Sequence, residues 1–304
     1  MRVNLTQAAK LLKEGVVAIP TETVYGLAAS LNDPQAIENI FELKGRPRKN
    51  PLIVHVASEK EVLELSLSQP PGFEDLKTLW PGPITLILPA DTAKIPSLVR
   101  AGLSTVAFRV PALPLARELL KITGPLVVPS ANLSGRPSST EPKHVEEDFG
   151  KDFPVLDGGT CQKGLESTIL AFHESSGRWR ILRQGAIAPE RLKDVLGYTP
   201  EVVVPESGQD PECPGQLFRH YAPKATLTAT DDAEVVLGFK EREYSLPILL
   251  LGSLDSPEEV AHNLYFVLRE LDEKGIERAQ VDLDFPTHGL WATLRERLLK
   301  AMQN

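Results

Sequence analysis

Apolar residues along this chain occur in two patterns, short continuous runs and longer segments with a helical period. Runs at 16–19 (VVAI), 51–57 (PLIVHVA) and 84–89 (ITLILP) predict buried strands, because each is brief and bounded by proline or glycine. Segments 4–14 and 189–196 place apolar residues three and four apart, which predicts helices. Because several expected strands follow one another without a helix between them, we expect an α/β fold with a mixed sheet.

Further elements continue this pattern up to residue 196. Asp33 and Pro34 are a typical start for a helix, which we expect to end at a basic loop. The remaining strands are expected at 105–111, 125–128, 153–157, 167–172 and 178–183, and the remaining helices at 59–66, 72–80 and 113–123.

The last third of the chain has a different organisation. The stretch 198–224 is rich in proline and has little periodicity, which is typical of a linker. Beyond it, strands at 247–253 and 279–285 alternate with helices at 256–274 and 289–303, and right-handed crossovers would make these strands parallel. The expected parts are a large α/β domain at 1–200, a proline-rich linker at 201–225 and a small Rossmann-like α/β domain at 226–304.

Composition narrows the functional classes. A formal net charge of -8 argues against nonspecific nucleic-acid binding driven by overall charge. The two cysteines, Cys161 and Cys213, are too few for a disulfide scaffold or a cysteine metal site. With no signal-like N-terminus and no apolar run of about 20 residues, we expect a cytoplasmic protein without a membrane span.

The sharpest chemical signal is the run KGRPRK, which places Lys44, Arg46, Arg48 and Lys49 within six residues before a buried strand. Lysine and arginine supply charge and N–H donors to phosphate oxygens, so this loop suits a phosphate-rich ligand. A solvated surface loop would have the same composition, and the run alone leaves both interpretations open.

Other polar residues interrupt apolar strands or follow their ends. Arg109 lies in an apolar strand, so it needs either a structural carboxylate partner or a bound anion. The loop 129–140 (PSANLSGRPSST) follows a strand end, where ligands bind in α/β sheets, although a simple turn has similar residues. The sequence has no phosphate-binding G-x-x-x-x-G-K-[ST] loop, zinc spacing or Ser-His-Asp arrangement.

Taken together, nine collinear motifs resemble the threonylcarbamoyl-AMP synthase family in its long form. They are PTETVYGLA, KGRPRKNPLIVHV, WPGPITLIL, VAFRVP, PSANLSGRPS, LDGG, ESTI, LRQGAI and PGQLFRHYAPKA. The resemblance implies a YrdC-like twisted mixed sheet with a large basic cavity, followed by a small C-terminal domain. That C-terminal unit is shorter here than is usual in the long form.

The implied reaction joins L-threonine, bicarbonate and ATP into L-threonylcarbamoyl-adenylate and pyrophosphate, for the t6A modification of tRNA. The implied partners are therefore these substrates, with Mg2+ on ATP, and the machinery that transfers the threonylcarbamoyl group to tRNA. No metal site of the protein is expected.

The resemblance also assigns residues. The implied catalytic residues are Lys44, Arg46, Ser130 and Asn132. The implied threonine contacts are Thr23, His55, Arg109, Ser130 and Ser167. The implied nucleotide contacts are Lys44, Arg46, Asn50, Thr105, Asn132, Ser138, Arg183 and Tyr221, the last of these in a linker that would act as a lid.

Two alternatives compete with this hypothesis. A YrdC-like domain could instead be a module that binds double-stranded RNA or tRNA through a local basic face, and even a synthase could bind RNA weakly. A carbamoyl-adenylate enzyme, as in hydrogenase maturation proteins, would need acylphosphatase-like and zinc-finger regions, and the sequence has neither.

Overall fold

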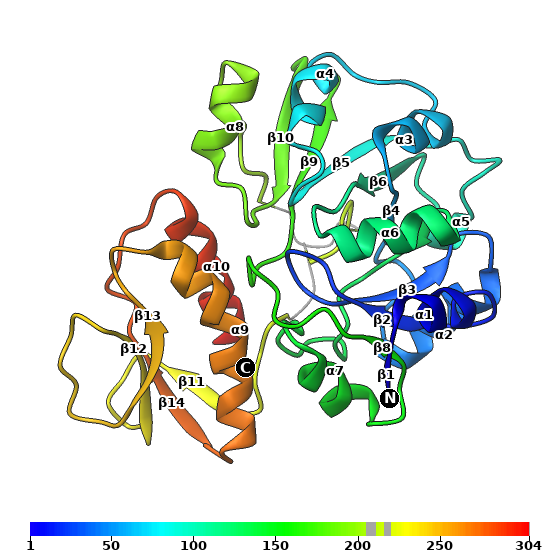
Figure 1. Cartoon of the computed structure of the whole chain (residues 1–304). Helices are drawn as coiled ribbons and strands as arrows, with labels where there is room; N and C mark the ends of the chain where they lie inside the picture. Colours follow the sequence, from blue (N-terminus) through cyan, green and yellow to red (C-terminus); the bar gives the residue numbers. More distant parts are fainter. Residues whose placement is uncertain (205–210, 216–219, 304) are drawn as a thin grey trace.

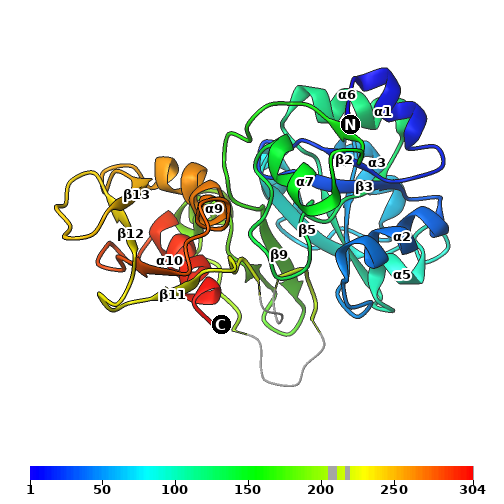
Figure 2. The same ribbon diagram turned by 90° about the horizontal axis from the view of Figure 1, so that it is seen from below.

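The computed structural model describes residues 1–204, 211–215 and 220–303. Two sheets form two lobes, a large one from the first part of the chain and a small one from the C-terminal part (Figures 1 and 2). The linker expected at 201–225 is described only in part, since residues 205–210 and 216–219 fall outside the described residues.

The large sheet has ten strands in the order β1-β8-β2-β3-β7-β4-β6-β5-β9-β10. Pairs such as β4 with β6 are parallel, whereas β5 with β6 is antiparallel, which confirms the mixed sheet. The strands are β1 (Arg2–Val3), β2 (Val17–Ile19), β3 (Gly26–Ser30), β4 (Ile53–His55), β5 (Ile84–Pro89), β6 (Thr105–Arg109), β7 (Leu126–Val127), β8 (Val155–Leu156), β9 (Thr168–His173) and β10 (Arg178–Arg183).

Helices cover both faces of this sheet. On one face α1 and α6 pack together over Val17 and Ile19, and on the other α2 packs over Ala18, because successive residues of a strand point to opposite faces. The helices are α1 (Leu5–Leu11), α2 (Pro34–Lys44), α3 (Glu59–Leu65), α4 (Phe73–Leu76), the 3-10 turn η1 (Lys77–Leu79), α5 (Ser97–Arg100), α6 (Pro114–Thr123), α7 (Pro142–Phe149) and α8 (Pro189–Leu196).

Helix α2 positions the basic loop that follows it. The Asp33 side chain accepts a hydrogen bond of 3.0 Å from the Ala36 N–H, and Pro34 occupies the first turn, as the sequence predicted. Gly45 ends the helix in the left-handed conformation, with φ of 59°. The chain therefore turns sharply between Lys44 and Arg46, and these two cations point in different directions with different partners.

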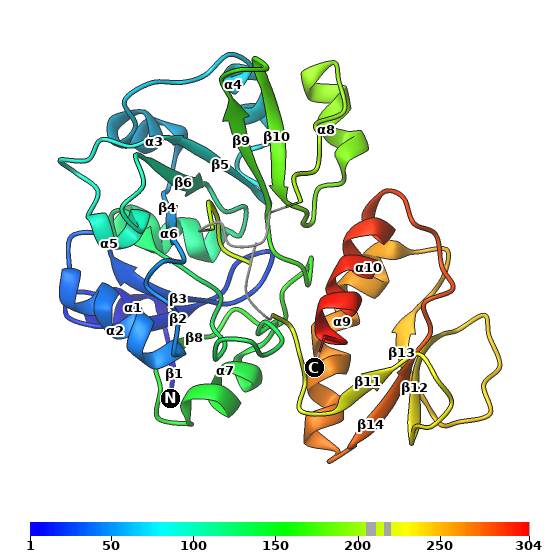
Figure 3. The same ribbon diagram turned by 180° about the vertical axis from the view of Figure 1, so that it is seen from behind.

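The small sheet has four parallel strands in the order β11-β14-β12-β13, which confirms the Rossmann-like prediction. Helices α9 and α10 lie between this sheet and the first domain (Figures 1 and 3). The elements are β11 (Thr226–Thr228), β12 (Val235–Phe239), β13 (Ile248–Gly252), α9 (Pro257–Glu273), β14 (Arg278–Val281) and α10 (Leu290–Ala301). Among the described helices, none is long and apolar enough to cross a bilayer.

Several elements were not expected. Strands β3 and β12, for example, have no bounding turn signals as clear as those of the strands that were predicted. Strand β3 is buried between two antiparallel neighbours, β2 and β7, so its place in the sheet depends on distant pairings that the local sequence does not encode.

Candidate active site

The turn after β2 presents the hydroxyl groups of two threonines to the interior. Thr21 Oγ1 accepts hydrogen bonds from the Thr23 and Val24 N–H groups at 3.1 and 3.2 Å and donates to the Val24 carbonyl at 2.7 Å. These bonds fix the turn, in which the Thr21 and Thr23 hydroxyls lie 2.7 Å apart. The side chain of Thr23 consequently faces Arg109 on β6, which donates to its Oγ1 at 2.8 Å.

Parallel pairing of β4 with β6 places His55 directly beside Arg109. Arg109 also forms a buried ion pair with Glu22, with 2.6 Å between Nη2 and Oε1. Burial, together with the Arg109 charge, lowers the pKa of His55 well below its usual value. Thr23, a neutral His55 and Arg109 therefore lie together on one part of the cavity wall, and the threonine contacts that the resemblance implied for them stay predictions.

Ser167 lies next to this cluster, immediately before β9. Its hydroxyl shares a hydrogen bond of 2.7 Å with the buried Thr85 on β5. Arg183, on the neighbouring strand β10, donates to the Ser167 carbonyl at 2.8 Å and to its hydroxyl at 3.2 Å. Arg183 also donates to the Pro214 carbonyl at 3.2 Å, so it joins the sheet to the linker.

The loop 129–140 is held by Lys44. The Lys44 ammonium donates to the carbonyls of Ser130 and Asn132 at 2.6 and 2.5 Å. Burial lowers its pKa well below the usual value, and the nearby charge of Arg46 adds to this effect. Asn132 donates to the Leu133 carbonyl at 2.8 Å, while its own Oδ1 is buried without a hydrogen bond from any described residue. That oxygen is available to a ligand N–H.

Within the basic run, Arg46 and Arg48 have opposite surroundings. Arg46 lines the cavity and donates to the carbonyls of Asn50 and Pro51 at 3.2 and 2.8 Å, and burial lowers its pKa to about 9. Arg48 is exposed and pairs with Glu38 on α2. The surface-loop interpretation thus fits Arg48, and the anion-site interpretation fits Arg46.

Tyr221, near the end of the linker, has a left-handed backbone, φ 69°, and a buried ring. The ring stacks on Tyr265 at a centroid distance of 5.4 Å, and the Arg297 guanidinium lies 4.8 Å from its centroid. Beside it, the half-buried His220 lines the cavity, and its loss of hydration together with the Arg46 charge lowers its pKa to about 3.

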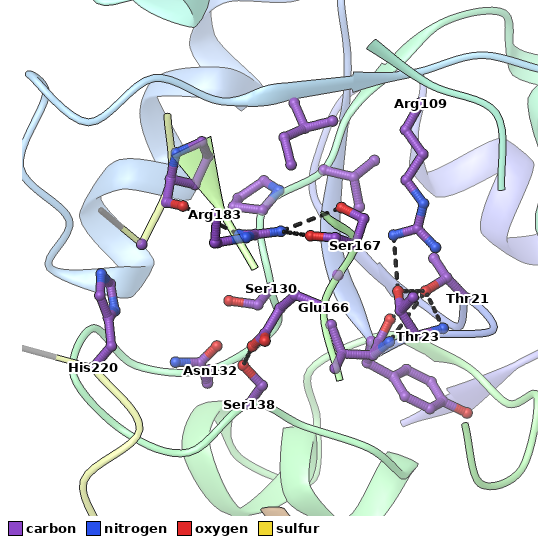
Figure 4. Close-up of a pocket in the computed structure, with 18 of the residues that line it drawn as sticks. Thr21, Thr23, Arg109, Ser130, Asn132, Ser138, Glu166, Ser167, Arg183 and His220 are labelled. Carbon is purple, nitrogen blue, oxygen red and sulfur yellow. Dashed lines mark hydrogen bonds between the residues drawn. The ribbon is translucent and has the colours of Figure 1, made fainter. Parts of the chain in front are cut away.

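Many of these side chains surround one cavity between the sheet, the 129–140 loop and the linker (Figure 4). Four arginines line it, Arg46, Arg109, Arg136 and Arg183, whereas Glu166 is the single carboxylate among its described lining residues. Such a lining favours an anionic ligand. The cavity has a volume of about 60 Å³, smaller than the large cavity that the resemblance implied, and Gly215, His220 and Tyr221 are part of its wall.

Comparisons with known proteins assign the chain to a family. A family model described as telomere recombination (Sua5_yciO_yrdC) matches residues 9–185, and one described as the threonylcarbamoyl-AMP synthase C-terminal domain matches residues 187–302. A curated threonylcarbamoyl-AMP synthase of Pyrococcus abyssi is 37% identical over 97% of this chain and 92% of its own length. The chain belongs to the threonylcarbamoyl-AMP synthase family. A second member, from Bacillus subtilis, is 36% identical over 98% of this chain and 92% of its own.

Solved structures agree with this assignment. The crystal structure of P. abyssi Sua5 complexed with L-threonine matches with a TM-score of 0.89 and 33% identity, over 99% of this chain and 96% of that one. Escherichia coli YciO, at 22% identity and a TM-score of 0.54, resembles this chain in fold over 61% of its length.

Most residues assigned by resemblance to this synthase family lie on the cavity wall. They are Thr23, Arg46, His55, Arg109, Ser130, Asn132, Ser138, Ser167, Arg183 and Tyr221. Three others are not among the lining residues. Lys44 donates to the backbone of the 129–140 loop, and Asn50 is buried and accepts from Arg46 through its carbonyl. Thr105 begins β6, four residues before Arg109. The roles that the resemblance implies for all of these residues, on the wall or not, stay predictions.

Sequence reasoning missed four buried residues of this synthase-family site. Thr21, Glu22 and Thr85 support the threonine-side cluster, and Glu166 accepts a hydrogen bond of 2.6 Å from Ser138. Burial acts to raise the pKa of Glu166, but the charges of Arg297 and Arg183 outweigh it and lower the pKa. The available signal was adjacency in the sequence, since Glu22 adjoins Thr23 and Glu166 adjoins Ser167, which were both singled out.

Proposed function

We propose that this chain is an L-threonylcarbamoyladenylate synthase, which converts L-threonine, bicarbonate and ATP into L-threonylcarbamoyl-adenylate and pyrophosphate. Family membership and the likeness to a threonine-bound relative support the reaction. The observation that carries the proposal here is convergence: the cluster of Thr23, His55 and Arg109 and the cations Arg46 and Arg183 line the same cavity.

The first cluster has the groups that threonine requires. Arg109 has N–H donors beyond those used for Glu22 and Thr23, and its Nε has no partner among the described residues, so it can bind the carboxylate. The threonine hydroxyl can pair with Thr23 or with neutral His55. The substrate ammonium must lose a proton to solvent before the amine can attack the carbon derived from bicarbonate. A C–N bond then forms, bicarbonate loses a hydroxyl that leaves as water with a second amine proton, and the carbamate forms beside Arg109.

On the other side, Arg46 and Arg183 can neutralise phosphate oxygens, while Ser138 and Asn132 can hydrogen-bond the nucleotide. A carbamate oxygen attacks the α-phosphorus, a new P–O bond forms, and the bond to the leaving pyrophosphate breaks. This step needs positioning and charge neutralisation rather than a covalent nucleophile.

Mg2+ would enter as part of the nucleotide substrate. No group of three or more His, Cys, Asp or Glu side chains among the described residues could hold a metal ion. On ATP it would be held largely by phosphate and water oxygens, which are its usual ligands in nucleotide sites.

We infer that part of the cavity wall moves during the cycle, as the lid implied by the resemblance would do. A site for a drug-sized ligand usually has about 300 to 1,000 Å³, well above the present volume of about 60 Å³. Displacement of the wall around Gly215 and Tyr221 would admit ATP, and its return would shield the carbamate from water. The product would then pass to the tRNA threonylcarbamoyl-transfer machinery, in the cytoplasm.

A direct assay tests the proposal. The purified chain receives ATP, Mg2+, bicarbonate and L-threonine, and pyrophosphate release is followed while each component is omitted in turn. We expect release that requires threonine, that falls by a factor of about 100 in Arg46→Met, and that is unchanged in the matched control Arg48→Met. Turnover without threonine would overturn the substrate assignment. Salt-sensitive RNA binding without turnover would favour the RNA-binding alternative.

A further inference from the structure

Glu166 links the cavity to the second domain. Its Oε1 accepts from Ser138 at 2.6 Å, and Ser138 lies on the nucleotide side of the cavity. Its Oε2 accepts from the Tyr265 hydroxyl at 2.9 Å and from Arg297 Nε at 3.4 Å. Ser138 and Glu166 belong to the first domain, whereas Tyr265 is on α9 and Arg297 on α10. One buried carboxylate thus joins both domains.

The same two residues of the second domain hold Tyr221. The Tyr221 ring is nearly parallel to that of Tyr265, with an interplanar angle of 20°, and the Arg297 guanidinium covers it. These contacts combine stacking with a cation–π interaction in a buried setting, where such an interaction is strongest. Tyr221 has a left-handed backbone that only its surroundings can maintain.

Helix α10 approaches the cavity wall with a single face. Thr293 Oγ1 lies 3.4 Å from the Gly185 carbonyl, Arg297 donates to the Gln184 carbonyl at 2.5 Å, and Lys300 donates to the Gly215 carbonyl at 3.1 Å. Positions four and three residues apart lie along one side of a helix. This face therefore fixes the backbone after Arg183 and the linker at Gly215.

Burying the Arg297 guanidinium costs free energy, so its contacts must be well placed to offset that cost. The side chain of Arg297 is 0% exposed, and a guanidinium in such a place is stable only with a carboxylate and well-placed acceptors. Ion pairs of this kind are weak contributors to net stability, but they define geometry where both partners are fixed. Here the geometry so defined is that of Ser138 and Tyr221.

We propose that Arg297 and Tyr265 are positioning residues for the nucleotide, acting through Glu166 and Tyr221. The second domain thereby completes the nucleotide side of the cavity, whereas the hydrogen bonds that hold Thr23 and Arg109 on the threonine side come from first-domain residues. This inference rests on the proposed function, because that function assigns Ser138 and Tyr221 to the nucleotide.

The test uses the full chain and separates the two substrates. In Arg297→Met we expect the KM for ATP to rise about tenfold while the KM for threonine changes by less than about twofold. Arg297→Lys, which keeps the charge, should recover part of the loss. Tyr265→Phe keeps the stacked ring and removes only the bond to Glu166, so its KM for ATP should rise by a factor of about three.

Two further measurements separate the possible outcomes. Arg242→Met is the matched control, since Arg242 pairs with Asp282 and Asp284 inside the second domain, and we expect wild-type KM values for it. Circular dichroism melts identify unfolded variants. An unchanged KM for ATP in folded Arg297→Met and Tyr265→Phe, or equal rises for both substrates, would overturn the inference.

Calorimetry with α,β-methylene-ATP distinguishes this inference from the proposed function. Weaker binding to the Arg297 and Tyr265 variants than to wild type supports the positioning role even if wild type shows no threonine-dependent turnover. Normal turnover by wild type with equal analogue affinity in all variants overturns the inference alone. A wild-type chain that binds no nucleotide overturns both.

Discussion

Arg109 and Glu22 form an ion pair of 2.6 Å in which both side chains are only 4% exposed. The Glu22 carboxylate therefore uses one N–H donor of Arg109, the residue to which we assign the threonine carboxylate. Glu22 Oε2 is buried and has no hydrogen-bond partner among the described residues, so the pair is only partly satisfied. A buried pair of this kind holds the arginine in place before substrate arrives.

Glu22→Gln should lower the free energy of unfolding by about 3 kcal/mol in the absence of ligand, because Arg109 becomes a buried cation without a carboxylate. A threonine carboxylate would replace the lost partner. We therefore expect saturating L-threonine to stabilise Glu22→Gln more than wild type in urea unfolding experiments. Threoninol, which lacks the carboxylate, is the control ligand, and equal stabilisation of both proteins by threonine would contradict this prediction.

Thr85→Val should weaken threonine binding without unfolding the sheet. Valine has nearly the volume of threonine but removes the hydroxyl bonded to Ser167. Ser167 then loses one of the bonds that orient it, and we expect the KM for threonine to rise by about threefold to tenfold with the KM for ATP nearly unchanged. Steady-state kinetics with each substrate varied in turn checks this. An effect confined to ATP would place Ser167 on the nucleotide instead.

Tyr221→Ala should lower synthesis while leaving the first domain folded. The ring closes the cavity against Tyr265 and Arg297, and its loss opens the site to water. We expect pyrophosphate release to fall by at least about tenfold, while circular dichroism stays like that of wild type. Unchanged activity would remove the lid hypothesis.

Acid should destabilise the protein through His144, among other groups. Burial, with the charge of Arg269 next in size, lowers the pKa of His144 to about 2. The unfolded chain has a histidine pKa of about 6.5, so below that pH it binds a proton at this histidine that the folded chain does not bind. The contribution of neutral His144 to stability is therefore fully present above about pH 6.5 and is lost as the pH falls below it. The loss from this one group is about 1.4 kcal/mol per pH unit between those two values.

Urea unfolding between pH 4 and 7 measures that contribution. His144→Asn keeps an acceptor for the Thr140 N–H, which bonds His144 Nδ1 at 3.2 Å, and should flatten the pH dependence by one proton. His288→Asn, at an exposed position, is the matched control and should leave the slope unchanged. If the unfolding free energy changed with pH equally in all three proteins, unfolding would not be coupled to proton uptake at His144.

Local signals allowed much of the fold and part of the site to be predicted. Helix α8 begins at Pro189 and ends at Leu196, as its periodicity indicated, and Asp33, Pro34 and Gly45 define α2 through caps that depend only on neighbouring residues. Composition could not predict that Arg46 lines the cavity while Arg48 is exposed, because this difference depends on how the chain turns after Gly45.

Contacts between distant segments were beyond local reasoning. Glu22 meets Arg109 across 87 positions, and Glu166 meets Arg297 across 131. Neither carboxylate stands out in a pattern of apolar and polar positions, since each is a single charge near a strand. Only the completed sheet and the docked second domain give them partners.

The ion pair between Glu166 and Arg297 also constrains how this lineage can change. A neutral substitution at either position alone would leave its partner charged in a dry interior, so the two codons should vary together or not at all. Homologues that consist of the first lobe only lack a residue equivalent to Arg297, so they should have either a neutral residue at position 166 or another cation that pairs with its carboxylate. An alignment of such short chains would show which of the two they have.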